Sequence, residues 1–322
     1  MIFTSIPSNY ASLTTPLIYR FDLEEMRDVV DVKIVDVIHN RTLGVRRLYD
    51  VQSAEVDIAP SLKRCFDLKP VDGGIAVVDA EGFYLVIAVE VDGLQSAERV
   101  FSPYPIQVGE GTIFRSGSKQ QTISRGQSDY IVIYAPNGGL VSCEAYIGES
   151  VTTRLDMVVE AMPGLQILKI EPNTLDIFTD LIIVSVNIDG IEDFLTYRIV
   201  EKPEMAKRLM WCAADGTIQF YTFPTCRARK THIEKQRVDT EQGLKIASCD
   251  AESVLSLISD YETVAQMERL GEILEAEYVW LDCGTDSVRV DVVSTESVVR
   301  FGGALNSLQV DIRAYNRKED KL

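Results

Sequence analysis

Several pairs of carboxylate side chains lie close enough together in this sequence to perform acid–base chemistry. The candidates are Glu24-Glu25, Asp176 with Asp180, and Glu192-Asp193. In a glycoside hydrolase, one such group protonates the leaving oxygen and the other acts as base or nucleophile. The chain has 49 acidic residues, so coincidental pairs are expected throughout, and these lie in turns or on polar strand faces. We expect no catalytic residue, and a carboxylate hydrolase is the minor alternative.

Other chemistries lack their signatures. The chain has two histidines, His39 and His232, and neither has an evident nucleophile beside it in the sequence. There is no G-x-S-x-G elbow, no phosphate-binding glycine loop, no EF-hand loop and no C-x-x-C pair. We therefore expect no cofactor and no dedicated metal ligands, although calcium bound between acidic surface loops stays open.

One basic cluster interrupts an acidic background. Its residues are Arg227, Arg229, Lys235 and Arg237, all at odd positions. In a strand, side chains at alternate positions share one face. The simpler interpretation is an edge strand protected by charge. The sharper hypothesis is a contact with an acidic neighbouring subunit, with nucleic acid as a distant third possibility.

Aromatic residues gather in the segment 209–224. Trp211, Tyr221 and Phe223, if exposed, would form a platform suited to binding a sugar. The same residues in a hairpin would form the core of a sheet, and this interpretation is favoured.

Alternating strands separated by turn dipeptides dominate the rest of the chain. Asp-Gly pairs occur at 72, 92, 189 and 215, and Asn137-Gly138 adds a fifth turn. Such pairs favour the positive φ angles of a tight hairpin turn. We therefore predict three hairpins, which join 75–78 with 83–91, 130–134 with 140–146, and 181–188 with 194–200.

Proline-containing breaks divide the chain into three regions. They are a β-sandwich-like domain over 1–103, a second one over 104–202, and an α+β domain over 203–322. In the third domain, apolar residues from Val254 to Leu274 recur at steps of three and four. This pattern predicts a long amphipathic helix over about 251–275, lying on an antiparallel sheet. The fold class is therefore mainly β.

Charge restricts the partners of the protein. Asp and Glu total 49 against 32 Lys and Arg, which gives a net charge of −17. Nucleic acids and anionic membranes select basic surfaces, so neither is an expected partner. The N-terminus lacks the parts of a secretory signal, and no apolar run approaches the ~20 residues that a spanning helix needs. We expect synthesis in the cytoplasm and no membrane insertion.

A pattern of turn and core residues extends over the first and third regions. It is carried by Leu209-Met-Trp211, Asp215–Ile218, Tyr221–Pro224, Leu43–Tyr49, Ala54–Pro60, Glu277–Leu281, Arg289–Val293 and Leu308–Tyr315. This pattern resembles that of uncharacterised phage and prophage structural, tail-associated proteins of gut Bacteroidales. The resemblance implies a component of a virion or tail-like particle that is made in the bacterial cytoplasm. It carries over no functional residue.

The sequence therefore predicts a non-enzymatic structural or assembly protein. It would act by self-association as a homo-oligomer and by docking to other structural proteins of the same assembly. The alternative is a carbohydrate-binding or adhesin-like β-sandwich module, assisted by calcium.

Overall fold

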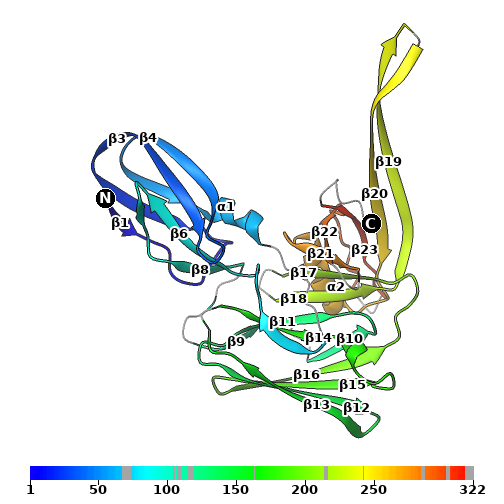
Figure 1. Ribbon diagram of the computed structural model, residues 1–322. Coiled ribbons are helices and arrows are strands. Elements are labelled where there is room, and N and C mark those ends of the chain that lie inside the picture. Colours follow the sequence, from blue (N-terminus) through cyan, green and yellow to red (C-terminus); the bar gives the residue numbers. More distant parts are fainter. Residues whose placement is uncertain are drawn as a thin grey trace. The chain divides into compact units, whose positions relative to one another are not determined.

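Strands dominate the computed structural model (Figure 1), which describes residues 1–66, 74–103, 106, 110–114, 119–162, 164–213, 217–241, 243–283, 287–301 and 305–315. Within these residues the strands form four sheets. The helical segments described are α1 (Ala59–Leu62), α2 (Val264–Gly271), η1 (Lys63–Cys65), η2 (Pro172–Thr174) and η3 (Glu272–Leu274). The predicted mainly β class is confirmed. The Asp-Gly turns expected at 72 and 215 lie outside the described residues.

The N-terminal sheet has seven strands. They are β1 (Ile2–Ser5), β2 (Ala11–Ser12), β3 (Ile18–Asp36), β4 (Arg41–Asp57), β6 (Leu85–Val91), β7 (Leu94–Gln95) and β8 (Arg99–Ser102). Alternate residues of β3, such as Val30, Val32 and Ile34, are buried, as the period of two requires. The pairings are antiparallel apart from the two-residue contact of β2 with β8.

Two further sheets lie as the layers of a β-sandwich (Figure 1). One contains β10 (Gln120–Ser124), β16 (Ile191–Val200), β15 (Leu181–Ile188), β12 (Gly139–Ile147) and β13 (Ser150–Val159). The other contains β5 (Ala76–Asp79), β14 (Gln166–Ile170), β11 (Asp129–Tyr134) and β9 (Thr112–Phe114). Every residue of β11 and β14 is buried, because both faces of these strands are covered.

One of the three predicted hairpins is confirmed. β15 and β16 pair antiparallel around Asp189-Gly190, whose φ angles of 51° and 80° suit a tight turn. The other two predictions are wrong, since β5 pairs with β14 rather than β6, and β11 and β12 belong to different layers. A turn dipeptide lets the chain reverse but does not select the partner strand. Two consecutive strands that each bury an apolar face can do so from opposite layers.

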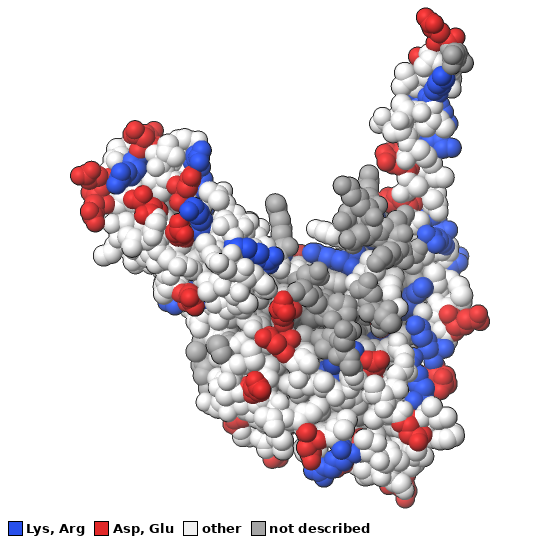
Figure 2. Space-filling model, viewed as in Figure 1, with Lys and Arg blue, Asp and Glu red and all other residues white. Residues whose placement is uncertain are grey.

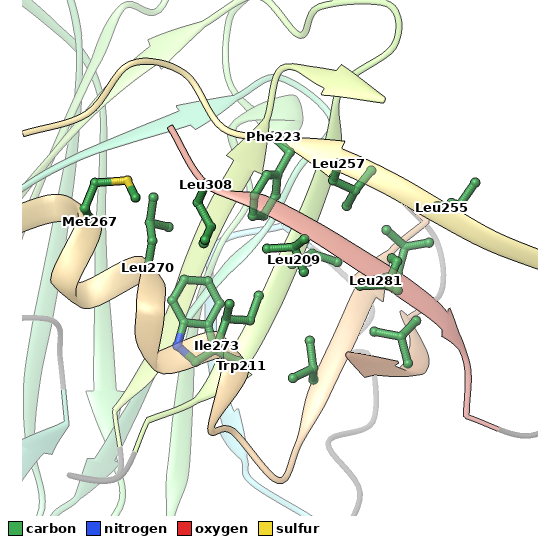
Figure 3. Packing of buried hydrophobic residues seen from close by; sticks show 14 residues of the cluster. Leu209, Trp211, Phe223, Leu255, Leu257, Met267, Leu270, Ile273, Leu281 and Leu308 are labelled. Carbon is green, nitrogen blue, oxygen red and sulfur yellow. The ribbon is translucent and has the colours of Figure 1, made fainter. Parts of the chain in front are cut away.

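The C-terminal sheet follows the order β18-β17-β21-β22-β23-β20-β19. Its strands are β17 (Lys207–Cys212), β18 (Ile218–Phe223), β19 (Thr225–Thr240), β20 (Gly243–Ile258), β21 (Val279–Asp282), β22 (Ser287–Val292) and β23 (Gln309–Ala314). Met267 and Leu270 of α2, with Ile273 just after it, pack on this sheet against Trp211 and Phe223 (Figure 3). This arrangement confirms the α+β prediction.

The helix is shorter than the predicted span of about 251–275. Residues 251–258 belong to β20, and α2 begins at Val264, where the Thr263 side chain accepts a hydrogen bond from the Gln266 amide. The apolar residues Val254, Leu257 and Ile258 fit a strand as well as a helix. Pairing of this segment with β19 on one side and β23 on the other decides for the strand.

The chain divides into two compact units, each made of several segments. The first comprises 1–121, 130–170 and 175–198, and the second 122–129, 171–174 and 199–322. A buried ion pair between Asp129 and Arg208 ties the 122–129 segment into the second unit. Arg208 also donates to Thr222 Oγ1 at 2.7 Å. The division into three domains, with boundaries at 103 and 202, stays a prediction.

We predict that truncating the buried end of β20 destabilises the protein while truncating its exposed end does not. Leu257 is 0% exposed and Leu244, on the same strand, is 72% exposed. Leu257→Ala removes core packing and leaves a cavity, which should lower the unfolding free energy by about 2–5 kcal/mol. Leu244→Ala should change it by less than about 0.5 kcal/mol. Urea unfolding measures both, and equal effects would contradict the described burial.

Candidate functional site

The hairpin of β19 and β20 continues beyond the rest of its sheet (Figure 1). The two strands pair with each other from Thr225 and Ile258 to Thr240 and Gly243. β20 also pairs with β23, but only over Val254–Ile258. Residues 231–253, here called the arm, therefore have no strand partner other than each other among the described residues.

The arm is folded by local features of its sequence. Thr240 Oγ1 donates to the carbonyl oxygen of Gly243 at 2.7 Å, which closes the end of the hairpin. Gly243 has a φ of 97°, a backbone conformation that glycine adopts without a steric penalty. The register shifts between Gln236 and Arg237. Such an irregularity increases the local twist of a strand pair.

The register of the arm defines two faces, because directly paired residues point to the same side of a sheet. The basic face carries Thr231, Ile233, Lys235, Arg237 and Asp239 of β19, and Leu244, Ile246, Cys249, Ala251 and Ser253 of β20. The acidic face carries His232, Glu234, Gln236 and Val238 of β19, and Lys245, Ser248, Asp250 and Glu252 of β20. Figure 2 shows charged side chains of both signs along the hairpin.

The basic face continues the buried side of the C-terminal sheet. Leu255 and Leu257 point to this side and enter the core of the second unit. Beyond them none of the described residues covers the face, so that Ile233 is 53% and Ile246 56% exposed. Exposed apolar side chains grouped on one surface are typical of an interaction site.

The structure brings together three of the four predicted contact residues. Arg229, Lys235 and Arg237 alternate along one side of β19, and all three are exposed. Arg227 is also exposed, but it lies at a register shift between Cys226 and Ala228 where the alternation is broken. A shared face is therefore shown for Arg229, Lys235 and Arg237, whereas Arg227 stands at the register shift. Their contact with another subunit stays a prediction.

The aromatic residues form core rather than a platform. Trp211 is 2% and Phe223 0% exposed, and both belong to the cluster under α2 (Figure 3). Tyr221 packs against the same cluster and donates its hydroxyl to Glu262 Oε1 at 2.6 Å. These rings are therefore not available to stack on a sugar.

The predicted carboxylate pairs serve local structure. Asp176 Oδ1 accepts a hydrogen bond from the Phe178 amide at 2.8 Å, and Asp193 Oδ1 accepts one from Phe194 at 2.9 Å. Glu24 bonds the N-terminal ammonium group at 3.1 Å. Contacts of this kind close turns and chain ends, and none of these carboxylates lines the cavity described next.

A cavity of about 550 Å³ beside the turn between β3 and β4 collects ionisable residues that the sequence did not single out as a group. His39 Nδ1 lies 2.8 Å from Asp36 Oδ2, and its Nε2 lies 3.3 Å from Glu81 Oε1. Arg41 Nε donates to Asp36 Oδ2 at 3.0 Å. The spacing Asp36-x-x-His39-x-Arg41 in a turn could have indicated the first contacts. Nothing local indicates Glu81, which comes from the segment before β6.

These contacts shift the ionisation of the residues involved. Hydrogen bonds that the imidazole donates to Asp36 and Glu81 raise the pKa of His39 above its usual value. Burial opposes ionisation of Asp36, but hydrogen bonds from His39 and Arg41 hold the pKa of this carboxyl below its usual value. The charged forms are thus mutually stabilising. The arrangement holds the turn and links it to the segment at residue 81.

The described residues contain no group of three or more His, Cys, Asp and Glu side chains placed to hold a metal ion. Nor does any helix among them have the length and apolarity needed to cross a membrane.

Comparison with known proteins adds little. No family model matches the chain, and no curated protein matches it in sequence. Among solved structures, the complex of Dpr2 Ig1-Ig2 with DIP-Theta Ig1-Ig3 contains a similar chain, with 10% sequence identity and a TM-score of 0.19. The similarity covers 99% of this chain and 91% of that chain. At so low a TM-score, it carries no information about function.

We predict that His39 stabilises the first unit most strongly at mildly acidic pH. The folded pKa of His39 lies above the unfolded value, so its contribution is fully present below about pH 6.5 and is lost as pH rises through the folded pKa. The melting temperature of His39→Gln should therefore fall further below that of the wild type at pH 5.5 than at pH 8.5. His232→Gln, on the exposed arm, is the control for losing an imidazole. An equal difference at both pH values would contradict the prediction.

Proposed function

We propose that this chain is a structural, non-enzymatic assembly protein that self-associates and docks to partner proteins through the arm. The observation that carries the proposal is the extension of β19 and β20 beyond their sheet with exposed apolar side chains. From the resemblance noted in the sequence, we propose that this assembly is a phage or prophage particle and that the chain is a tail-associated component made in the cytoplasm. Its other partners are structural proteins of the same particle.

Physical chemistry supports this role for the arm. A two-stranded hairpin is at best marginally stable by itself in water, and independent stability requires a third strand or a packed face. Ile233, Leu244 and Ile246 point to a side that nothing in the described structure covers. A contact with another molecule would supply the missing layer and remove this apolar surface from water.

Charges on β19 limit which contacts the arm can make. β19 is the last strand of its sheet, and a free strand edge can pair with any other chain. Natural proteins protect such edges with charged side chains, Lys above all. Lys230 and Lys235, with Arg229 and Arg237, provide this protection. The arm is therefore suited to selective docking through a face rather than to uncontrolled pairing at its edge.

The carbohydrate-binding alternative has lost the feature that motivated it. The aromatic side chains of Trp211 and Phe223 are buried. No observation on the described residues favours a sugar site, so the assembly role is the function we propose.

We predict that shortening the arm abolishes self-association without unfolding the protein. In the shortened variant, an Asn-Gly turn replaces residues 232–252 and joins the paired residues Thr231 and Ser253. The pairing of β20 with β23 remains. Light scattering over a range of concentrations should show oligomers of the 36.0 kDa chain for the wild type and a monomer, lighter by the mass of 19 residues, for the variant.

The matched control is Val158→Asp, which changes an exposed apolar residue (70%) outside the arm and should leave association unchanged. A wild-type protein that is monomeric at every concentration would contradict the proposed self-association. A shortened variant that still forms oligomers would show that another surface is responsible.

A further inference from the structure

We infer that the cavity beside the turn between β3 and β4 binds a small organic cation, a primary amine that carries an apolar group. The cavity lies within the first unit and the arm within the second, so this inference goes beyond the proposed function and does not depend on it. The evidence is the size of the cavity, the apolar side chains in its lining and the charges around it.

The cavity has the size of a small-molecule site. Its volume of about 550 Å³ falls within the roughly 300–1,000 Å³ of pockets that hold small ligands. The apolar part of its lining comes from Ile38, Leu43, Leu85 and Val86. Such pockets combine apolar walls with a few polar groups that orient the ligand. A ligand with an apolar group would therefore bury that group against these side chains.

The charged part of the described lining is more acidic than basic. The acids are Asp36, Asp79 and Glu81, and the bases are His39 and Arg41. Both bases bond Asp36 Oδ2, His39 Nδ1 at 2.8 Å and Arg41 Nε at 3.0 Å. His39 also reaches Glu81 Oε1 at 3.3 Å, so that one imidazole serves two carboxylates. Asp36 is thus balanced within the turn, and Asp79 and Glu81 give the cavity its negative character.

Asp79 is the carboxylate of this lining without a cation beside it. Among the described residues it forms no ion pair, and its hydrogen-bond donor is the Tyr84 hydroxyl, 3.2 Å from Oδ2. Burial and the charge of Glu81 raise the pKa of Asp79, and the hydrogen bond from Tyr84 offsets this only in part. The surroundings therefore disfavour the ionised carboxylate, and an ammonium group bound beside it would remove this penalty.

The backbone holds these groups in place. The Phe83 amide donates to the Ala80 carbonyl oxygen at 2.8 Å, which closes the turn between β5 and β6. Gly82 in this turn has a φ of 88°, a conformation that glycine adopts without a steric penalty. The Tyr84 ring lies against Gly164, where a Cβ atom would come within 2.6 Å of ring atom Cζ. The two carboxylates and the phenol are therefore positioned before a ligand binds.

This arrangement selects the charge of the ligand. An ammonium group donates three hydrogen bonds, and the carboxylates of Asp79 and Glu81 are acceptors. An anion would meet two like charges instead. A neutral molecule would cover Asp79 without compensating its charge, which is unfavourable. The apolar side chains then favour an amine with an apolar group over a small hydrophilic amine, because binding removes that group from water.

Three probes with the same apolar group separate the effect of charge from that of apolar contact. They are 4-phenylbutylamine, 4-phenylbutanol and 4-phenylbutyrate, each titrated into the full chain at about pH 7 by isothermal titration calorimetry. The amine should bind at least about tenfold more tightly than the alcohol, because it adds charged hydrogen bonds. The carboxylic acid should bind more weakly than either. Absence of amine binding, or equal binding of the amine and the alcohol, would overturn the inference.

A double variant locates the binding site. Asp79→Asn with Glu81→Gln removes both negative charges at nearly constant side-chain size, and it should weaken amine binding at least about tenfold. The matched control is Glu25→Gln with Asp28→Asn, which neutralises two exposed residues of β3 and should bind the amine like the wild type. Because a chain with a net charge of −17 attracts any cation, this comparison is decisive. Equal loss in both variants would show general attraction and no site.

Stability is measured on the same variants. Since the folded pKa of Asp79 is raised, its ionised form destabilises the folded state at pH values above that pKa. Asp79→Asn alone should therefore not lower the melting temperature at neutral pH. If the double variant is unfolded, this single variant replaces it and should still bind the amine several-fold more weakly. A folded Asp79→Asn protein that binds the amine like the wild type would contradict the inference.

A lysine side chain of another protein carries the same ammonium group as a free amine. Nα-acetyl-lysine amide is therefore titrated as a fourth probe. Weaker binding than that of 4-phenylbutylamine is expected, because the lysine stem offers less apolar surface. Tighter binding would assign the cavity to a protein lysine and overturn its assignment to a small amine. The arm-shortened protein keeps the whole cavity and should bind 4-phenylbutylamine like the wild type, whatever its oligomeric state.

Discussion

The pairing of β20 with β23 is the interaction on which the C-terminal half of this protein depends. Over Val254–Ile258 it gives β20 a neighbour on each side. It directs Leu255 and Leu257 into the core under α2. Because β23 ends there while β20 continues, the rest of β20 and its partner β19 leave the sheet as a hairpin. This one strand pairing thus positions core residues of β20 and also directs the arm away from the core.

Charged side chains of the second unit have two different roles, depending on whether they are buried or exposed. Asp129 and Arg208 form an ion pair that is closed off from solvent, and Thr222 accepts a further hydrogen bond from the Arg208 guanidinium. Such a pair orients the segment that carries Asp129, because removing either partner would leave a buried charge alone. Lys235 and Arg237 remain in water on the arm, where a charge retains its hydration and is free to meet a partner.

A net charge of −17 makes separate copies of this chain repel one another in solution. The arm nevertheless carries charges of both signs, because Lys235 and Arg237 lie on one face and Glu234 and Asp250 on the other. A partner that docks on the arm, as proposed, would therefore meet a surface whose local charge differs from that of the whole chain.

Local sequence predicted those features that depend on a few neighbouring residues. The alternation of polar and apolar residues indicated strands, and Asp189-Gly190 indicated the β15–β16 turn because its backbone angles suit few other residue pairs. The odd spacing of Arg229, Lys235 and Arg237 indicated their common face, since alternation is a property of any strand. The shift at Arg227 was invisible because a bulge depends on the partner strand.

Tertiary structure decided which strands pair and how far each one continues. Residues 251–258 suit a helix or a strand, and only the neighbours β19 and β23 select the strand. The link from His39 to Glu81 joins residues far apart in sequence, so no local pattern predicts it. The sequence by itself determined strand character, turns and charge. The long-range pairing that leaves the arm without a further strand neighbour among the described residues depends on the whole chain. Each strand must find partners for its backbone hydrogen bonds and bury its apolar face at the same time, and local sequence does not specify which strands meet both needs.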